Sequence, residues 1–148
     1  ADELCFLNVT ASVNDEAPVI DLVRRVARSV FVPFTVGGGI SDVASAAAVL
    51  AAGADKVSTS SAAFRRPEVI AKMVKEFGPE KVTVAIDVDQ NPALPSGYEV
   101  YIDGGRTPTG ADAVEWAKKV KQLDLKGAVL DGTFFDGDLL EIFLDALE

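Results

Sequence analysis

Short apolar runs alternate with helical patterns along the whole chain. A helix beginning at about Pro18 is indicated by valines at the i, i+4, i+7, i+11 spacing: Val19, Val23, Val26 and Val30. Further helices are predicted from Ser41 or Asp42 to Gly53, from Pro67 to Gly78, over 111–123 and over 139–147. The runs between them predict strands over 4–10, 34–36, 56–59, 82–88, 98–102 and 128–130. Residues 91–97 and 104–110, which contain prolines and glycines, predict loops.

These elements make five strand–helix units. Apolar strands joined by helical crossovers predict an α/β fold, a parallel sheet covered by helices on both faces. Five units complete an open, flavodoxin-like sheet, whereas a closed (βα)8-barrel needs roughly 250 residues. We therefore expect 1–148 to be a single domain. It is either an open sheet, which is favoured for a lone chain, or a partial (βα)8-barrel completed by self-association.

Composition narrows the possible partners and chemistry. The formal net charge of -9 argues against nucleic acid and against anionic membranes, and no apolar run approaches the roughly 20 residues of a membrane span. Cys5 is the only cysteine, which excludes an internal disulfide and leaves the cytoplasm as the default location. Since the sequence has no histidine, acid–base chemistry falls to carboxylates, hydroxyls and lysines.

Polar residues follow every strand of the five units. In both architectures ligands bind at the carboxyl ends of the strands, so a polar ligand site is expected there. The candidates are Asn8, Gly37, Gly38, Gly39, Ser60, Ser61, Asp87, Asp131 and Asp136. No group of acids has a recognisable metal-ligand spacing, so we expect neither a metal nor another cofactor.

The glycine run is the candidate anion site. Gly37, Gly38 and Gly39 lie between a strand and a helix start, where the backbone can approach an anion and amides of the helix are free; a tight turn is the alternative. Ser60 and Ser61 can donate to the same anion, or cap the next helix. The glycines are not a dinucleotide fingerprint, because Asp42 stands at the place of the third glycine.

Asp87 is the candidate catalytic residue. It follows the apolar run 82–86. A carboxylate at the end of a buried strand is costly unless it is paired or functional.

Several stretches carry a family resemblance. They are 2–12, Pro-Phe-Thr-Val-Gly-Gly-Gly-Ile at 33–40, 53–58, Val-Ala-Ile-Asp at 84–87, Gly-Gly-Arg at 104–106, and Trp116. Over residues 1 to about 138 the chain resembles the cyclase subunit of imidazole glycerol phosphate synthase, a (βα)8-barrel lyase of histidine biosynthesis, and matches its units two to six. The resemblance implies that Asp87 is one of two acid–base aspartates, and that Gly39, Ser60 and Ser61 bind a substrate phosphate.

The sequence also departs from this family. Asn8 stands where the family has Asp, Ser60 where it has Asn, and Asp131 where it has Thr. Phe134 and Phe135 replace an acid and an arginine, while Asp136 is retained. The family's other catalytic aspartate and its second phosphate site belong to strands that these 148 residues do not match.

The resemblance also bears on a glutaminase partner. Glu3 and Lys56 match two positions of the family's ammonia gate. Gly127 stands where a third, acidic, position should be, which argues against a working channel from that partner.

Two functions remain open at this point. The first is a phosphate-binding remnant of the cyclase with little or no turnover, whose ligand is a phosphorylated sugar or a phosphate or sulfate ion. The second is a non-catalytic scaffold or assembly module, natural or engineered, which forms homo-oligomers through its open sheet edges.

Overall fold

The computed structural model describes residues 2–8, 20–123 and 130–131 of the chain. Five parallel strands form its main sheet, in the order β1-β2-β3-β4-β8. They are β1 (Leu4–Leu7), β2 (Phe34–Gly37), β3 (Lys56–Thr59), β4 (Val82–Ala85) and β8 (Leu130–Asp131). The predicted α/β fold is confirmed.

The strand order selects between the two expected architectures. Each strand of the main sheet pairs with its neighbours in chain order, as in a (βα)8-barrel. In a flavodoxin-like sheet the strands do not pair in chain order. Their order in the sheet is 2-1-3-4-5. The main sheet is therefore an open sheet with barrel order, in which β1 and β8 are the outer strands.

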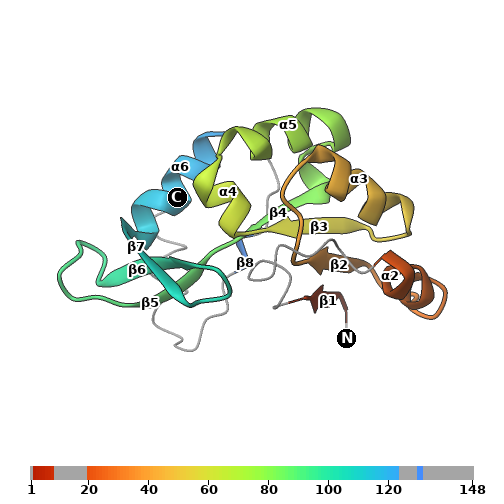
Figure 1. Cartoon of the computed structure of the whole chain (residues 1–148), viewed down its shortest axis with the longest axis horizontal. Helices are drawn as coiled ribbons and strands as arrows, with labels where there is room; N and C mark the ends of the chain where they lie inside the picture. Colours follow the sequence, from red (N-terminus) through yellow and green to blue (C-terminus); the bar gives the residue numbers. More distant parts are fainter. Residues whose placement is uncertain (1, 9–19, 124–129, 132–148) are drawn as a thin grey trace.

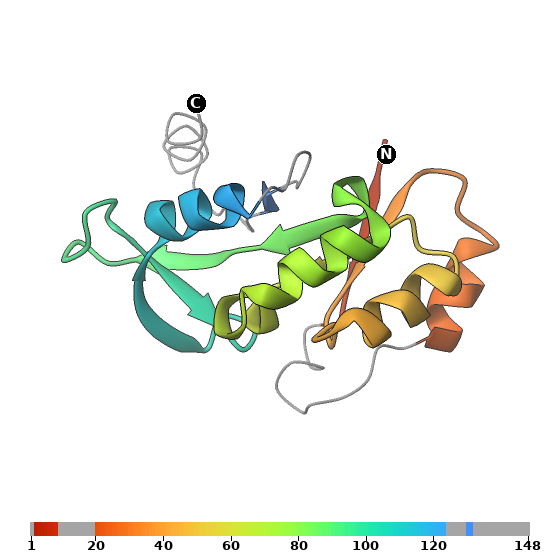
Figure 2. The ribbon, with the colours of Figure 1, turned by 90° about the horizontal axis from the view of Figure 1, so that it is seen from above.

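The described helices are α2 (Ile20–Ala27), α3 (Val43–Ala51), α4 (Ser61–Arg65), α5 (Glu68–Phe77) and α6 (Ala113–Gln122). Figure 1 shows α3, α4, α5 and α6 on one face of the main sheet, with α2 beside β2; Figure 2 gives the view from above. We had expected helices on both faces, as in a doubly wound sheet. A sheet with barrel order instead places its helices on the outer face.

Local signals explain where these helices begin and end. Pro67, with φ -54°, precedes α5, and Gly78 follows it with φ +90°, a backbone conformation that suits glycine. Asp42 caps α3 by accepting the N–H of Ser45 at 2.8 Å. Both predicted starts are confirmed. The short helix α4 was not predicted.

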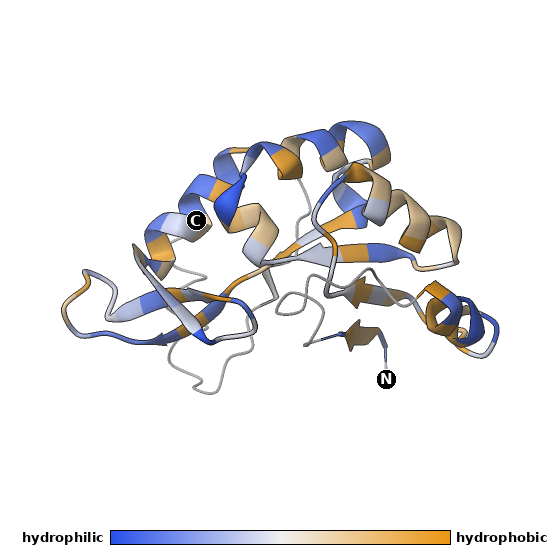
Figure 3. Cartoon of the chain, in the orientation of Figure 1, coloured by the Kyte–Doolittle hydropathy of each residue, from blue (hydrophilic) through white to orange (hydrophobic). Residues whose placement is uncertain are grey.

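Two hydrophobic clusters lie between the helices and the sheets. One joins α2, α3 and α5 to β2 and β3 around Val49, Val57 and Met73. The other joins α4, α5 and α6 to β4 and β6 around Ile70 and Trp116. Figure 3 shows the corresponding apolar stripes on the helices. Complete burial of a side chain such as Ile70 contributes roughly 2 kcal/mol.

The predicted strand 82–88 is in fact two strands in different sheets. After β4 the chain continues as β5 (Asp87–Gln90), which pairs antiparallel with β6 (Tyr98–Ile102) and not with the main sheet. The apolar pattern continues through the change of sheet, because Ile86 belongs to the second cluster and Val88, on the other side of Asp87, packs against it. The pattern therefore gave no signal of a break.

The predicted loop 104–110 is wrong in its second half, since only residues 104–106 lie in a turn. Its second half belongs to β7 (Thr107–Asp112), which pairs with β6. Gly104 and Gly105, with φ +66° and +75°, make the turn between them. Pro108 argued against a strand here. An outer strand tolerates a proline, however, because one side of it needs no ladder hydrogen bonds.

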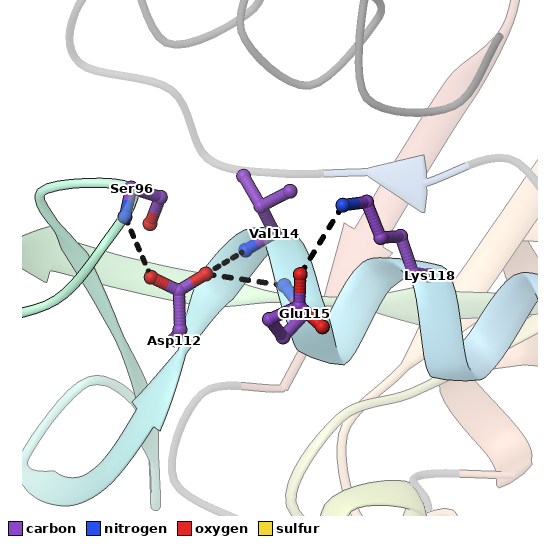
Figure 4. Close-up of polar contacts among 5 residues, drawn as sticks. All are labelled: Ser96, Asp112, Val114, Glu115 and Lys118. Atoms are coloured by element: carbon purple, nitrogen blue, oxygen red, sulfur yellow. Dashed lines mark hydrogen bonds and ion pairs between the residues drawn. The ribbon is translucent and has the colours of Figure 1, made fainter.

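Asp112 ties this antiparallel sheet to α6 (Figure 4). One carboxylate oxygen accepts the N–H groups of Val114 and Glu115 at 3.0 and 3.1 Å, and the other accepts the N–H of Ser96 at 2.7 Å. Burial alone would raise the pKa of Asp112, but the hydrogen bonds from Ser96, Glu115 and Val114 outweigh it and hold that pKa below its usual range. The ionised carboxylate therefore fixes the start of α6.

Some predictions fall wholly or partly on residues outside the described ranges. They are the first helix before Ile20, the strand residues 9, 10, 128 and 129, the helix 139–147, Phe134, Phe135 and Asp136.

Candidate functional site

The carboxyl ends of the parallel strands β2, β3 and β4 lie at the same end of the main sheet. Gly37 lies opposite Ser58, and Thr59 lies opposite Val84. This register brings the glycine turn, the serines after β3 and Asp87 to the same end of the sheet. These three segments therefore lie together at the strand ends, and the ligand site expected there stays a prediction.

The glycine turn passes directly against the backbone of Asn8. Gly38 has φ +93° and Gly39 has φ +72°, in the left-handed region. A Cβ on Gly38 would lie 2.8 Å from the carbonyl carbon of Asn8. The N–H of Asn8 also donates to the carbonyl of Gly37 at 2.9 Å. Gly38 is thus required by both conformation and space.

The helix that follows the turn does not offer every amide we had expected. The Asp42 carboxylate already accepts the N–H of Ser45, and this bond, reinforced by the Ser45 hydroxyl, holds the pKa of Asp42 below its usual range. The N–H groups of Ser41 and Asp42 also donate to Ser45 Oγ, each at 3.2 Å, so we expect an anion at the turn to use the amides of the glycines. Arg66 donates to the carbonyl of Ser41 at 2.9 Å, which places a cation beside the turn.

Ser60 and Asp87 form the polar pair of the site. Asp87 is half-buried, and Ser60 lies close enough to affect the pKa of its carboxyl group. Burial raises the pKa of Asp87, and the hydrogen bond from Ser60 opposes that shift in part. A carboxyl whose proton is retained more firmly than usual, at the end of a barrel strand, is suited to acid–base work.

Ser61 has a different environment from Ser60. Its side chain is buried, and its Oγ accepts the N–H of Asp103 at 2.9 Å. Asp103 also accepts from Arg65 Nη2, at 2.8 and 2.7 Å to its two carboxylate oxygens. The hydrogen bond between Ser61 and Asp103 thus joins α4 to the β6–β7 turn. The expected contact of Ser61 with a phosphate stays a prediction.

The other strand-end candidates are less fully described. Asn8 contacts the glycine turn through its backbone. Asp131 lies opposite Ala85 in the register of β4 and β8. Asp136 is outside the described ranges.

Arg65, Arg66 and Asp103 were missed by the sequence analysis. The ion pair between Arg65 and Asp103 joins residues 38 positions apart. No motif spacing signals such a contact. It depends on β6, which brings the turn back to α4.

The described ranges contain neither a candidate metal-binding cluster nor a candidate membrane-spanning helix. Within 2–8, 20–123 and 130–131, no group of three or more His, Cys, Asp or Glu side chains could hold a metal ion. No helix in the same ranges is both long and apolar enough to cross a membrane.

The opposite end of the strands carries an ion pair. Lys56 Nζ lies 3.1 Å from a carboxylate oxygen of Glu3. These are the two side chains that the resemblance matches to an ammonia gate, and their role in such a gate stays a prediction. Gly127, the position that departs from the gate, lies outside the described ranges.

The shifted pKa of Asp87 leads to a stability prediction. Its pKa is raised on folding, so the folded protein loses stability as pH rises from the ordinary value of 3.8 through the raised value. At neutral pH the ionised, half-buried carboxylate is therefore destabilising. We expect Asp87→Asn to resist urea better than the parent at pH 7, with the gain disappearing well below pH 3.8.

Urea unfolding at the two pH values measures this difference. Asp89→Asn on the same strand, where the side chain is exposed, is the matched control and should show no comparable gain. A loss of stability in Asp87→Asn at pH 7 would contradict the assignment of burial as the main cause.

The strand order, the outer layer of helices and the polar strand ends define a barrel-type βα protein. A model of the family described as histidine biosynthesis protein matches residues 1–147, and the chain belongs to that family. Among its relatives, the imidazole glycerol phosphate synthase subunit HisF of Synechococcus sp. (strain CC9311) is 49% identical over 138 residues, covering 93% of this chain and 51% of the relative. The corresponding subunit of Prochlorococcus marinus (strain NATL2A) is 46% identical, covering 93% and 53%. The chain spans about half the length of these curated relatives.

Proposed function

We propose that this chain contributes a phosphate-binding half-site and one acid–base carboxylate of an imidazole glycerol phosphate synthase cyclase. The observation that carries the proposal is the register of β2, β3 and β4, which brings the glycine turn, Ser60 and the half-buried Asp87 to one end of the main sheet. The similarity to synthase subunits over 93% of the chain supports it. Its ligand would be a phosphorylated sugar, with free phosphate or sulfate as a simpler occupant.

The geometry favours an anion at this edge in two ways. Gly38 and Gly39 have no side chains, so a phosphate can approach their backbone closely. Ser60 begins α4 without using its hydroxyl as a cap, which leaves that hydroxyl for Asp87 or for a ligand. A phosphate bound here would lie next to the carboxyl group that moves the proton.

Ser60 can hydrogen-bond to a phosphate and to Asp87 at the same time only when Asp87 is protonated. Its hydroxyl has a single hydrogen to donate, so a phosphate and an ionised Asp87 compete for it. A protonated Asp87 could instead donate to Ser60 Oγ, which frees the hydroxyl hydrogen for the phosphate. The raised pKa of Asp87 makes that protonated form more accessible than usual.

We further propose that the 148-residue chain has little or no turnover alone. The family resemblance assigns the other acid–base aspartate and a second phosphate site to strands that these residues do not match. Binding without efficient reaction is the expected behaviour of such a half-site.

The Ser60 hydroxyl provides the test of binding. We expect Ser60→Ala to weaken the binding of inorganic phosphate by roughly tenfold or more, because a hydrogen bond to a charged ligand is lost. Isothermal titration of the parent and the variant measures the change. Ser29→Ala, an exposed serine at the end of α2, is the matched control. Equal phosphate affinity in the parent and Ser60→Ala would contradict the half-site.

A second candidate function is an assembly module. β1 is an outer strand of the main sheet, and its Leu4 and Leu7 are 39% and 46% exposed. An outer strand with exposed leucines favours pairing with another strand. Concentration-dependent sedimentation together with an absence of phosphate binding would favour this candidate over the half-site.

A further inference from the structure

Asp103 is held by two residues of the same short helix. Its backbone N–H donates to Ser61 Oγ at 2.9 Å. Its carboxylate accepts from Arg65 Nη2 at 2.8 and 2.7 Å. Asp103 has φ +58°, a left-handed conformation that Asp tolerates better than most residues. The β6–β7 turn is therefore fixed to α4 through both its backbone and a side chain.

These contacts link the two elements that carry Ser60 and Asp87. Ser60 directly precedes Ser61, at the start of α4. Asp87 lies opposite Tyr101 in the β5–β6 pairing, two residues before Asp103. Ser60 is thus attached to α4, and Asp87 is attached to the antiparallel sheet that carries the β6–β7 turn. Movement between these two sides would change the distance between Ser60 and Asp87.

We infer that Asp103 and Arg65 are positioning residues, which fix the antiparallel sheet against α4 and thereby set the geometry of the Ser60–Asp87 pair. This inference rests on the proposed function of that pair. Neither residue needs to touch the ligand, because each acts through the elements that carry Ser60 and Asp87.

The charges around the contact agree with this role. The hydrogen bond from Arg65, with a smaller contribution from Thr107, holds the pKa of Asp103 below its usual range, so the ion pair is present at neutral pH. The side chains of Arg65 and Asp103 are 51% and 22% exposed. Ion pairs with such exposure usually add little to global stability. Loss of the Arg65–Asp103 ion pair should therefore change the Asp87 titration and phosphate binding more than it changes the urea midpoint of unfolding.

Asp103→Asn is the sharpest test. Asn tolerates a left-handed backbone and preserves the N–H that Ser61 accepts, so the substitution removes mainly the charge. We expect the carboxyl group of Asp87, followed by NMR against pH, to titrate closer to its ordinary pKa as the contact loosens and its burial falls. We also expect inorganic phosphate to bind roughly threefold to fivefold more weakly.

Arg65→Lys gives a second variant that does not depend on the folding of the first. It retains the charge but loses the planar guanidinium that reaches both carboxylate oxygens. It should change the Asp87 titration in the same direction, and the double variant should show no further change, because both act through one contact. Arg24→Gln, which breaks the exposed Arg24–Asp21 pair on α2, is the control and should leave the titration unaltered.

An unchanged Asp87 titration in both Asp103→Asn and Arg65→Lys would overturn the inference. Additive shifts in the double variant would also overturn it, because they would mean separate effects. If the parent chain does not bind phosphate, the proposed function fails, but the Asp87 titration still decides whether Asp103 and Arg65 position the pair.

Discussion

Replacing Gly38 with alanine is expected to destabilise the protein by roughly 3 kcal/mol or more. Two independent costs contribute. The backbone of Gly38 has φ +93°, which a residue with a Cβ rarely adopts. The added Cβ would also lie 2.8 Å from the carbonyl carbon of Asn8, and backbone atoms cannot rotate away as the end of a side chain can. Urea unfolding of the parent and the variant measures the loss.

A second glycine separates these two costs. Gly97 also has a left-handed backbone, with φ +79°, but a Cβ there would meet nothing within 4 Å. Gly97→Ala should therefore lose only the conformational contribution, about 1–2 kcal/mol. If Gly38→Ala lost no more stability than Gly97→Ala, Asn8 would not lie as close to the glycine turn as described. The placement of the candidate anion site would then be wrong as well.

The 148-residue chain alone is expected to turn over the phosphorylated-sugar substrate of the proposed cyclase reaction at least about 10²-fold more slowly than a full-length relative. General acid and base groups each contribute roughly 10²–10⁴-fold, and the chain supplies one of the two aspartates that the resemblance assigns. A steady-state assay beside the HisF subunit of Synechococcus sp. (strain CC9311) makes the comparison.

Two further samples make that assay decisive. Asp87→Asn should abolish any residual turnover, because it removes the carboxyl group proposed to transfer the proton. A second polypeptide that supplies the remaining strands should raise the activity of the parent but not of Asp87→Asn. Turnover by the chain alone within tenfold of the full-length relative would contradict the proposed half-site.

The fold could be predicted well where local chemistry decides the structure. β3 begins and ends as its apolar run predicts, at Lys56 and Thr59. α5 lies between Pro67 and Gly78, which favour a start and an end for clear conformational reasons. The sequence could not predict the division between β4 and β5. Ile86 and Val88 are apolar on both sides of it, and only pairing with β6 reveals the change of sheet.

The candidate site divides in the same way. The strand-end rule brought together the glycine turn, Ser60 and Asp87 from positions far apart in the chain. It could not distinguish Ser60, which lies close to Asp87, from Ser61, whose Oγ accepts the N–H of Asp103. Adjacent residues at the start of α4 point to different neighbours, and those neighbours are set by tertiary structure.

The most direct test of the phosphate half-site is an NMR titration of the isotope-labelled chain with inorganic phosphate. Saturable shifts are predicted at the backbone amides of Gly38, Gly39 and Ser60, with the amides of α6 unchanged. A folded spectrum in which those three amides do not respond, or in which the largest shifts lie on α6, would contradict the account.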